Sequence, residues 1–501
     1  MPPRAPAPNP THLNISRHAR PACRTAFVPV ARRSPSPAPH SNTSRGAGME
    51  GTSPIIDVKR FIDEQRFSPY QWGILAVCFL LIAIDAYDAL TVGFVVPALM
   101  QGWQMDKAVF GPVMSASIVG MAVGAMISGP LYDRSTPKTV MVVSMVMFGL
   151  CSFGSIFSET PLSLGIWRLL TGLGIGAAVP GVNTLMFEYA PTRRSSLVIN
   201  TIACGGMLGA AACGVAAGLL VPTYGWKCLF VVGAVLPIVL ALVVHFYMPE
   251  PLRFMVMRNW PAERIAAVLR RVAPRHDFNG ARFVVTEEQA EDRKSGMGVL
   301  LSRRLRTGTL MLWLAYFSGT FAYYLLMGWL PTLLQEAGAS LRNATLATSV
   351  LSVGGIAGAL CFGWLMDRLD RNTVIALAFV VGGASIWTLG RQAGQPELLP
   401  VILFIAGAGL SGAMFSLPGL AAAYYPTNGR SAGIAWMYGI GRIGGILGPV
   451  AGGMLLHATG SAGFYAVATA TILLPGFALW IKRRAASRNA GADGVGVMRD
   501  A

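Results

Sequence analysis

Two aspartates lie in the middle of the apolar segment LLIAIDAYDALTVGFVVPALM, residues 80–100. A charged aspartate at the centre of a membrane helix costs roughly 2.5–3.5 kcal/mol, so this pair requires a specific role. Asp85 and Asp88 are three residues apart and share one helix face, where we expect them to titrate as a coupled pair. A carboxylate that exchanges protons near neutral pH can load a proton on one side of a membrane and release it on the other. The pair predicts a proton-coupling site; the alternative is a structural pair bonded to a neighbouring arginine.

A second charged residue, Arg442 in GIGRIGGILG, lies deep in a C-terminal apolar segment. It is about twelve residues into the segment, roughly 18 Å at 1.5 Å per residue. An arginine at that depth needs an anion. Its planar fork can bind a substrate carboxylate through two bonds, or it can pair permanently with an aspartate. We favour a role in substrate binding or coupling, and we expect the surrounding glycines mainly to permit close helix packing.

The composition places the chain among helical membrane proteins. Hydrophobic residues make up 53% of the 501 residues and charged residues 13%, whereas soluble domains carry roughly 25% charged residues. Apolar runs of about 20 residues recur, each long enough to cross a bilayer as a helix. The net charge of +17 does not predict nucleic-acid binding, because seven arginines lie in the acid-free segment 1–48 and most others separate apolar runs. The seven cysteines have no metal-type spacing, so we expect neither a metal site nor a disulfide framework.

The apolar runs predict twelve spans, six on either side of a polar segment. Residues 1–48, rich in Pro, Ser and Arg, are expected to be a disordered tail, or to lie outside the protein if translation starts at Met49. An N-terminal half (49–248), a central loop (249–307), a C-terminal half (308–483) and a tail (484–501) follow. The expected spans are about 72–100, 108–132, 138–157, 161–187, 196–220, 226–248, 308–331, 344–366, 372–392, 397–420, 430–455 and 460–482.

Basic residues are concentrated on one side of these spans. The rich side carries the central loop and both termini, together with Arg134, Arg193, Arg368 and Arg430. The other side has few basic residues, such as Lys107 and Lys227. Lys and Arg favour cytoplasmic loops, so this pattern predicts that both termini and the central loop are cytoplasmic.

The two halves also resemble each other. GPLYDRSTPKTV (129–140) aligns without gaps to GWLMDRLDRNTV (363–374), and each copy joins the second span of its half to the third. YAPTRRS (189–195) is echoed by YYPTNGRS (424–431). Parallel repeats of six spans are a transporter architecture, with the substrate site near mid-membrane between the halves.

With these motifs the chain resembles the major facilitator superfamily, and within it the aromatic acid:proton symporters, such as the 4-hydroxybenzoate/protocatechuate and benzoate transporters. The similarity runs from about residue 55 to 483, and one departure is Ala86, where the family motif Asp-Gly-x-Asp has glycine. We expect the Ala86 methyl group to affect how the substrate fits its site more than it affects proton coupling. The similar segments are DAYDALTVGFVVPAL, GPLYDR, WRLLTGLGIGAAVP, EYAPTRRSS, VVHFYMPEPLRF, LMGWLPTLL, GWLMDR and YPTNGRSAGIAWMYGIGRIGGILGP.

The resemblance implies a proton-coupling role for Asp85 and Asp88 and a functional role for Arg168, about two turns into the fourth span. Arg168 is expected either to be the counter-ion of one of these aspartates or to contact the substrate. Glu188, at the other end of the same span, is expected to gate the pathway or to clamp a loop.

Gating residues are expected in the paired G-x-L-x-D-R loops. Their acids can cap the next helix or pair with an arginine of another helix, and such contacts hold one side of a transporter shut. A purely topological anchor is the alternative. The candidates are Asp133, Arg134, Asp367 and Arg368, with Arg430 at the start of the eleventh span.

An aromatic substrate favours ring partners, and the seventh span is rich in them. The sequence WLAYFSGTFAYYLLMGW offers several tyrosines, of which Tyr323 and Tyr324 lie mid-span with hydroxyl groups that need hydrogen-bond partners. We select these two as substrate-binding candidates, although any single aromatic here can equally serve packing or face lipid.

The sequence therefore predicts an all-α polytopic membrane protein with the major facilitator fold. We expect a monomeric secondary transporter, not an enzyme, that imports an aromatic carboxylate across the bacterial inner membrane by proton symport and alternating access. The proton is its coupling ion and no other cofactor is expected. The alternatives are an uncoupled or differently coupled carrier of another organic anion, such as a muconate-like dicarboxylate, and a membrane sensor of aromatic acids.

Overall fold

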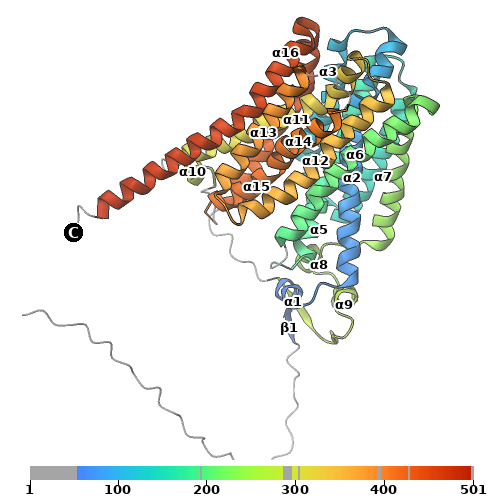
Figure 1. Ribbon diagram of the computed structural model, residues 1–501. Helices are drawn as coiled ribbons and strands as arrows, with labels where there is room; N and C mark the ends of the chain where they lie inside the picture. The colour runs from blue at the N-terminus through green and yellow to red at the C-terminus, as the bar shows by residue number, and fades with distance from the viewer. Residues whose placement is uncertain are drawn as a thin grey trace, which may run out of the picture. The chain divides into compact units, whose positions relative to one another are not determined.

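The computed structural model describes residues 54–191, 195–285, 296–302, 305–391, 397–426 and 429–497. The predicted tail 1–48 and its alternative start at Met49 lie outside these residues. Helices dominate the described chain, and most are long and apolar (Figure 1). The N-terminal half holds α2 (Pro69–Trp103), α3 (Lys107–Arg134), α4 (Pro137–Gly154) with the 3-10 turn η1 (Ser155–Phe157), α5 (Pro161–Tyr189), α6 (Ser195–Tyr224) and α7 (Lys227–Tyr247). The C-terminal half holds α11 (Arg306–Glu336), α12 (Leu341–Met366), α13 (Arg371–Arg391), α14 (Leu399–Gly407), the π-helical turn η3 (Ala408–Gly412), α15 (Ala413–Tyr424) and α16 (Arg430–Val497).

These helices account for all twelve predicted spans. Within the described residues eleven segments are long and apolar enough to cross a membrane, and the last of them, Ala432–Arg484, is twice the usual length. Gly460 breaks α16 with φ 66° and ψ −164°, a conformation that only glycine adopts readily. The break divides α16 at the boundary predicted between the eleventh and twelfth spans. The helix continues through Val497, so most of the predicted tail 484–501 is helical.

The internal repeat is visible in the helix caps. Thr136 and Asp370 occupy equivalent positions of the two aligned loops, and each precedes a third helix of its half. The Thr136 hydroxyl accepts a hydrogen bond from the Thr139 backbone N–H, and the Asp370 carboxylate accepts one from the Thr373 backbone N–H. Both side chains satisfy backbone donors that a helix N-terminus leaves free. The repeat therefore encodes the same turn in both halves.

The halves meet along three helix pairs, α3 with α16, α6 with α12, and α2 with α11. Close approach depends on small residues. Gly93 of α2 packs directly on Gly328 of α11, where an added Cβ would lie 2.9 Å from the Gly328 backbone. These pairs bring the second and eleventh spans, and the first and seventh, into contact between the halves.

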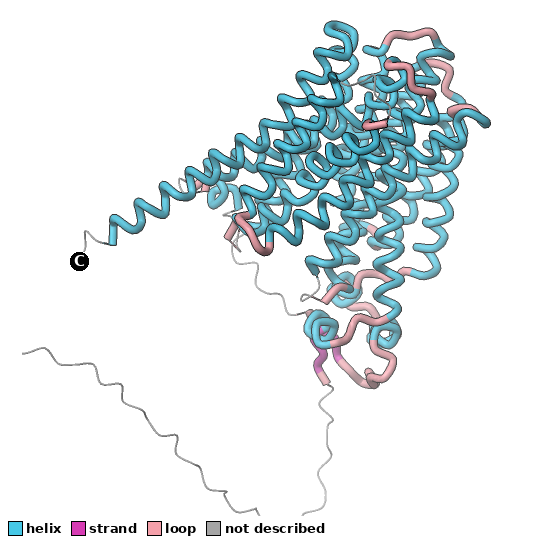
Figure 2. Tube along the Cα trace, in the orientation of Figure 1, coloured by secondary structure: helices cyan, strands magenta, loops and turns pink. Residues whose placement is uncertain are grey.

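Part of the predicted central loop is folded rather than irregular. The strands β1 (Ile55–Asp57) and β2 (Arg282–Val284) pair in parallel, and α1 (Val58–Glu64), α8 (Leu252–Met257) and α9 (Ala262–Val272) pack beside them, followed by the short α10 (Gly296–Leu300). The strands lie at the end of the helices where α1 and α9 also lie (Figures 1 and 2). We call β1, α1, α8, α9 and β2 the loop subdomain. Its apolar positions recur at helical spacing in α9, which buries Ile265, Leu269 and Val272.

Candidate functional site

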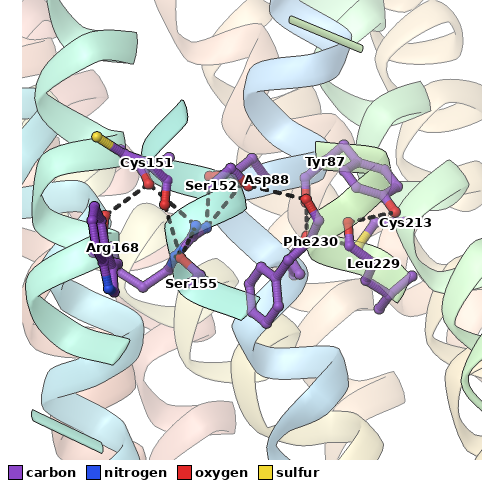
Figure 3. A network of polar contacts seen from close by, with 12 residues as sticks. Tyr87, Asp88, Cys151, Ser152, Ser155, Arg168, Cys213, Leu229 and Phe230 are labelled. Atoms are coloured by element: carbon purple, nitrogen blue, oxygen red, sulfur yellow. Dashed lines mark hydrogen bonds and ion pairs between the residues drawn. The ribbon is translucent and has the colours of Figure 1, made fainter. Parts of the chain in front are cut away.

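Asp88 and Arg168 form a buried ion pair inside the N-terminal half. Asp88 lies on α2 and Arg168 on α5, and the side chains of both are 0% exposed. The Arg168 Nη1 donates to both carboxylate oxygens of Asp88 at 3.0 Å (Figure 3). The structure thus places Arg168 at Asp88 and makes it the counter-ion of that aspartate.

Side chains of α4, η1 and α5 complete the bonding of this pair. The Ser155 hydroxyl accepts from Arg168 Nε at 3.2 Å and from Nη2 at 2.6 Å, and Thr171 accepts from Nη2 at 3.1 Å. The Ser152 hydroxyl donates to Asp88 Oδ1 at 3.1 Å. The Arg168 guanidinium also lies 4.8 Å from the centre of the Phe230 ring. A buried charge pair is stable when its remaining donors and acceptors are satisfied in this way.

Asp85 has a different environment, although it lies one turn from Asp88 on the same helix. Its Oδ1 is buried and has no hydrogen-bond partner among the described residues. A cavity of about 10 Å³ adjoins it and is otherwise lined by apolar side chains of α2, α4, α5 and α7, which is near the lower limit for one water. An ionised carboxylate without partners is costly in such surroundings. Asp85 is therefore the member of the pair whose charge still needs a proton or a cation.

The structure brings Arg442 and Tyr324 of the C-terminal half toward Asp85. The charges of Asp88 and Arg442 both act on Asp85, and those of Asp85 and Arg442 both act on the Tyr324 hydroxyl. Arg442 is half-buried on α16, and its Nη1 donates across the interface to the backbone carbonyl of Met121 on α3 at 2.9 Å. No described carboxylate lies within 4.0 Å of Arg442. Asp85, Tyr324 and Arg442 thus lie within electrostatic range of one another between the halves.

The two selected tyrosines of α11 point to different places. The Tyr323 ring is buried and packs edge-on against Tyr324 at 5.2 Å and Phe415 of α15 at 6.2 Å, so it contributes to the interior of the C-terminal half. Tyr324 is half-buried and close to Gly445, where an added Cβ would lie 3.1 Å from its ring. Of the pair, Tyr324 is the one placed between the halves.

Ala86, the departure from the family motif, faces α6. An ideal Cβ built on Gly206 would lie 3.9 Å from the Ala86 methyl group. The methyl group therefore contributes to the contact between α2 and α6.

The candidate gating residues are spread over the side that carries the loop subdomain. Arg134, Asp367, Arg368 and Arg430 are exposed, and the side chain of Asp133 lies outside the described structure. Arg368, in the turn after α12, stacks over Trp364 of that helix, with its guanidinium carbon 4.0 Å from the ring centre. Among the described side chains of Arg134, Asp367, Arg368 and Arg430, no ion pair joins one to another.

Glu188 contacts the loop subdomain. Its Oε2 accepts a hydrogen bond from the Arg253 backbone N–H of α8 at 3.1 Å. Glu188 follows the apolar span Pro161–Met186, and burial raises its pKa to about 7. Nearby, the Tyr189 hydroxyl donates to the Glu250 backbone carbonyl at 2.9 Å. Gating and loop clamping were the two roles predicted for Glu188, and both stay predictions.

Contacts between the halves occur on the side opposite the loop subdomain. His457 Nδ1 lies 2.9 Å from Asp106 Oδ2, and Lys107 forms an ion pair with Glu336. Deeper in the interface the Ser115 hydroxyl donates to the Ile446 carbonyl at 2.6 Å. Among these contacts, the bond between Arg442 and Met121 is the nearest to the loop-subdomain side.

Sequence reasoning missed several residues of the site. Ser152 and Ser155, which bond Asp88 and Arg168, were not selected, although their spacing of three places both on one helix face. Tyr316, which feels the charge of Arg442 and packs edge-on against Tyr438 at 5.4 Å, was not selected either. Small hydroxyl side chains and aromatic residues are common in membrane spans, so their types alone did not single them out.

Comparisons with known proteins agree with this architecture. The model of the Major Facilitator Superfamily matches residues 75–341 and 312–497. A 4-hydroxybenzoate transporter of Pseudomonas aeruginosa is 43% identical over 80% of this chain and 90% of its own length. A gallate transporter of Pseudomonas putida is 43% identical over 80% of this chain and 89% of its own length. A benzoate transport protein of Acinetobacter baylyi is 31% identical over 80% of this chain and 87% of its own length.

Solved structures confirm the fold. The crystal structure of a D-xylose–proton symporter aligns with a TM-score of 0.62 at 16% identity, over 82% of this chain and 97% of the symporter. The relatives named above are transporters rather than enzymes, as the sequence predicted. The fold, the family model and relatives at 31–43% identity agree, and the chain therefore belongs to the Major Facilitator Superfamily, in its aromatic acid transporter family.

Proposed function

We propose that this protein is a secondary transporter that carries an aromatic carboxylate together with a proton. The relatives named for 4-hydroxybenzoate, gallate and benzoate support the substrate class. These molecules share a ring and a carboxylate, and such an anion does not cross lipid freely. A carrier for them needs a cation for the carboxylate, aromatic side chains for the ring and an acid that exchanges the coupling proton.

The observation that carries this proposal is the contrast between the two aspartates. Asp88 is fully bonded to Arg168, Ser152 and the surrounding shell. Asp85 keeps a buried oxygen without a partner and lies within reach of the charge of Arg442. In this proposal Asp85 takes up and releases the proton. Asp88 and Arg168 hold the first and fourth spans together and set the electrostatic field around Asp85.

Arg442 and Tyr324 are the proposed substrate contacts. Arg442 has no carboxylate partner in the described chain and uses Nη1 on a backbone carbonyl, which leaves two of its three nitrogens for a substrate carboxylate. Tyr324 offers an edge or face to the aromatic ring and a hydroxyl to a ring substituent. Protonation of Asp85 removes the negative charge closest to Arg442, so the arginine becomes free to bind the substrate anion. This exchange couples the proton to the substrate.

Alternating access follows from the two halves. The contact between Asp106 and His457 and the ion pair Lys107–Glu336 join the halves on the side opposite the loop subdomain. We assign the loop-subdomain side to the cytoplasm, from its excess of Lys and Arg, in the inner membrane of a bacterium. On that assignment these contacts lie on the outer side of the membrane, and in this proposal opening to the outside requires them to break.

The test is uptake of radiolabelled 4-hydroxybenzoate into cells that express the protein, with and without a protonophore. Benzoate, protocatechuate, vanillate, gallate and muconate serve as unlabelled competitors. We expect accumulation that the protonophore abolishes and that one ring acid competes best. Uptake that a protonophore leaves unchanged would refute proton coupling, and competition by muconate alone would refute the aromatic substrate class.

A further inference from the structure

An apolar groove runs along the surface of the C-terminal half, away from the interface between the halves. It has a volume of about 310 Å³ and lies between α12, α13, α14 and η3. All of its lining residues are apolar. Leu369 and Leu377 on its walls are each 59% exposed, which leaves the groove open to the surrounding medium. In a chain that spans a membrane, that medium at this level is lipid.

The groove adjoins an irregular part of the tenth span. Residues Ala408–Gly412 form a π-helical turn between α14 and α15, and such single turns occur often at functional sites. Ala408 and Gly409 place no large side chain at the bottom of the groove. Gly409 packs against the backbone of Gly382 on α13, where an added Cβ would lie 2.5 Å from the Gly382 nitrogen. Phe362 and Phe404 also line the groove.

A cluster of cations adjoins one end of the groove. Leu365 and Leu369 line the groove and flank Arg368 in the sequence, and Val374 lines it three residues after Arg371. Arg368 stacks over Trp364, and the Arg371 Nε donates to the Met366 carbonyl at 3.4 Å. Among the described residues neither guanidinium has a carboxylate within 4.0 Å.

The nearby acid Asp370 is already engaged. Its carboxylate accepts hydrogen bonds from the backbone and hydroxyl of Thr373 and lies 3.9 Å from Arg483. These contacts hold the pKa of Asp370 below its ordinary value. The loop between α12 and α13 therefore presents two arginines whose charge is not neutralised by an ion pair.

We propose that the groove is a binding site for an anionic phospholipid of the surrounding bilayer. One acyl chain lies between α12, α13 and α14 over the π-helical turn, and the phosphate is held by Arg368 and Arg371. The assignment rests on the match between an open apolar groove and unneutralised arginines at its end. Arginine binds phosphate through a planar fork, and basic sites beside membrane helices select acidic head groups. The inference requires only that the chain spans a membrane, and it is independent of the transported substrate.

Photo-crosslinking of the full-length protein in nanodiscs tests this site. The probes are phosphatidylglycerol and phosphatidylcholine with the same diazirine-bearing acyl chain, each added in small amount to unlabelled phosphatidylcholine discs. Adducts are located by peptide mass spectrometry. We expect labelling of the segments 362–381 and 404–409 to be roughly tenfold stronger with phosphatidylglycerol.

Two variants and two matched controls make the result specific. Arg368→Gln with Arg371→Gln should bring the two lipids to equal labelling, whereas Arg391→Gln, which removes another exposed arginine stacked on a tryptophan, should preserve the preference. Leu377→Trp should displace the acyl chain from the groove, whereas Leu360→Trp, at an equally exposed leucine outside it, should not. All five positions are exposed, so the variants are expected to fold.

The proposal is overturned by equal labelling with both lipids in the unmodified protein, or by a preference that survives loss of both arginines. It is also overturned if adducts are as abundant around Leu360 as in the groove. Discs loaded with two copies provide a last check. Groove labelling that disappears in two-copy discs would identify a second copy as the occupant instead of a lipid.

Discussion

The clearest consequence of the site geometry is that neutralising Asp88 should lower the thermal stability of the protein, whereas neutralising Asp85 should not. The substitutions Asp85→Asn and Asp88→Asn are chemically identical and three residues apart on α2. Asp88 receives two contacts of 3.0 Å from the fully buried Arg168 and one of 3.1 Å from Ser152. Asp85 has an unpartnered buried oxygen. The substitutions therefore remove very different interactions.

The expected magnitude for Asp88→Asn follows from the charge that it strands. Removing one partner of a buried ion pair leaves the other charge uncompensated and costs about 3–5 kcal/mol. For a six-helix half of roughly 200 residues that unfolds as one unit, this loss corresponds to a decrease of roughly 6–20 °C in Tm. For Asp85→Asn we expect an unchanged or slightly higher Tm, because no hydrogen bond to Oδ1 is lost.

The assay combines thermal unfolding in detergent with uptake by reconstituted protein. Asp88→Asn should recover much of its lost stability when combined with Arg168→Gln, because the stranded cation is removed as well. Asp85→Asn should fold normally and abolish accumulation driven by a proton gradient, while exchange of labelled for unlabelled substrate persists. Equal loss of Tm in the two single variants, or gradient-driven accumulation by Asp85→Asn, would refute the division of roles.

Three further outcomes are expected. Arg442→Lys should raise the substrate concentration for half-maximal uptake about 10–100-fold, because lysine lacks the planar fork of arginine. The control Arg391→Lys should leave uptake unchanged. Equal effects of the two substitutions would contradict the proposal that Arg442 binds the substrate carboxylate. Because burial raises the pKa of Glu188 from 4.5 to about 7, its stabilising contribution is complete below pH 4.5 and is lost as the pH rises through 7. Unfolding measured from pH 4.5 to 8 should show a smaller loss of stability with rising pH in Glu188→Gln than in the unmodified protein. Identical pH profiles of the two proteins would contradict the role of Glu188 in this pH dependence. Phe61→Ala removes a ring that is 8% exposed and packs edge-on against Phe278 at 5.3 Å. The loss should destabilise the loop subdomain by about 3–5 kcal/mol and expose residues 262–285 to protease. The control Phe246→Ala removes a ring that is 78% exposed and should not change the digestion.

Much of the fold could be predicted from the sequence because the bilayer imposes simple rules. Apolar runs of the required length located all twelve spans, since a helix in lipid must satisfy its own backbone. The loop subdomain was missed because its strands are short and far apart in sequence. Ile55 pairs with Arg282 although the whole N-terminal half lies between them in the sequence. No local sequence pattern predicts such a contact. Its helix α9 is apolar on one face only, so its mean hydropathy is too low to predict a membrane span.

For the site, the sequence determined which residues were candidates, because ionisable side chains inside apolar spans are rare and expensive. Asp85, Asp88, Arg168 and Arg442 could all be identified in this way. Only the tertiary structure decided how they pair. A helical offset of about 60° between positions three apart aims Asp88 at α5, whereas Asp85 Oδ1 has no hydrogen-bond partner in the part of the chain that the structure describes. Which charge is compensated depends on neighbours brought from up to hundreds of residues away, and this is why two identical side chains one turn apart acquire different roles.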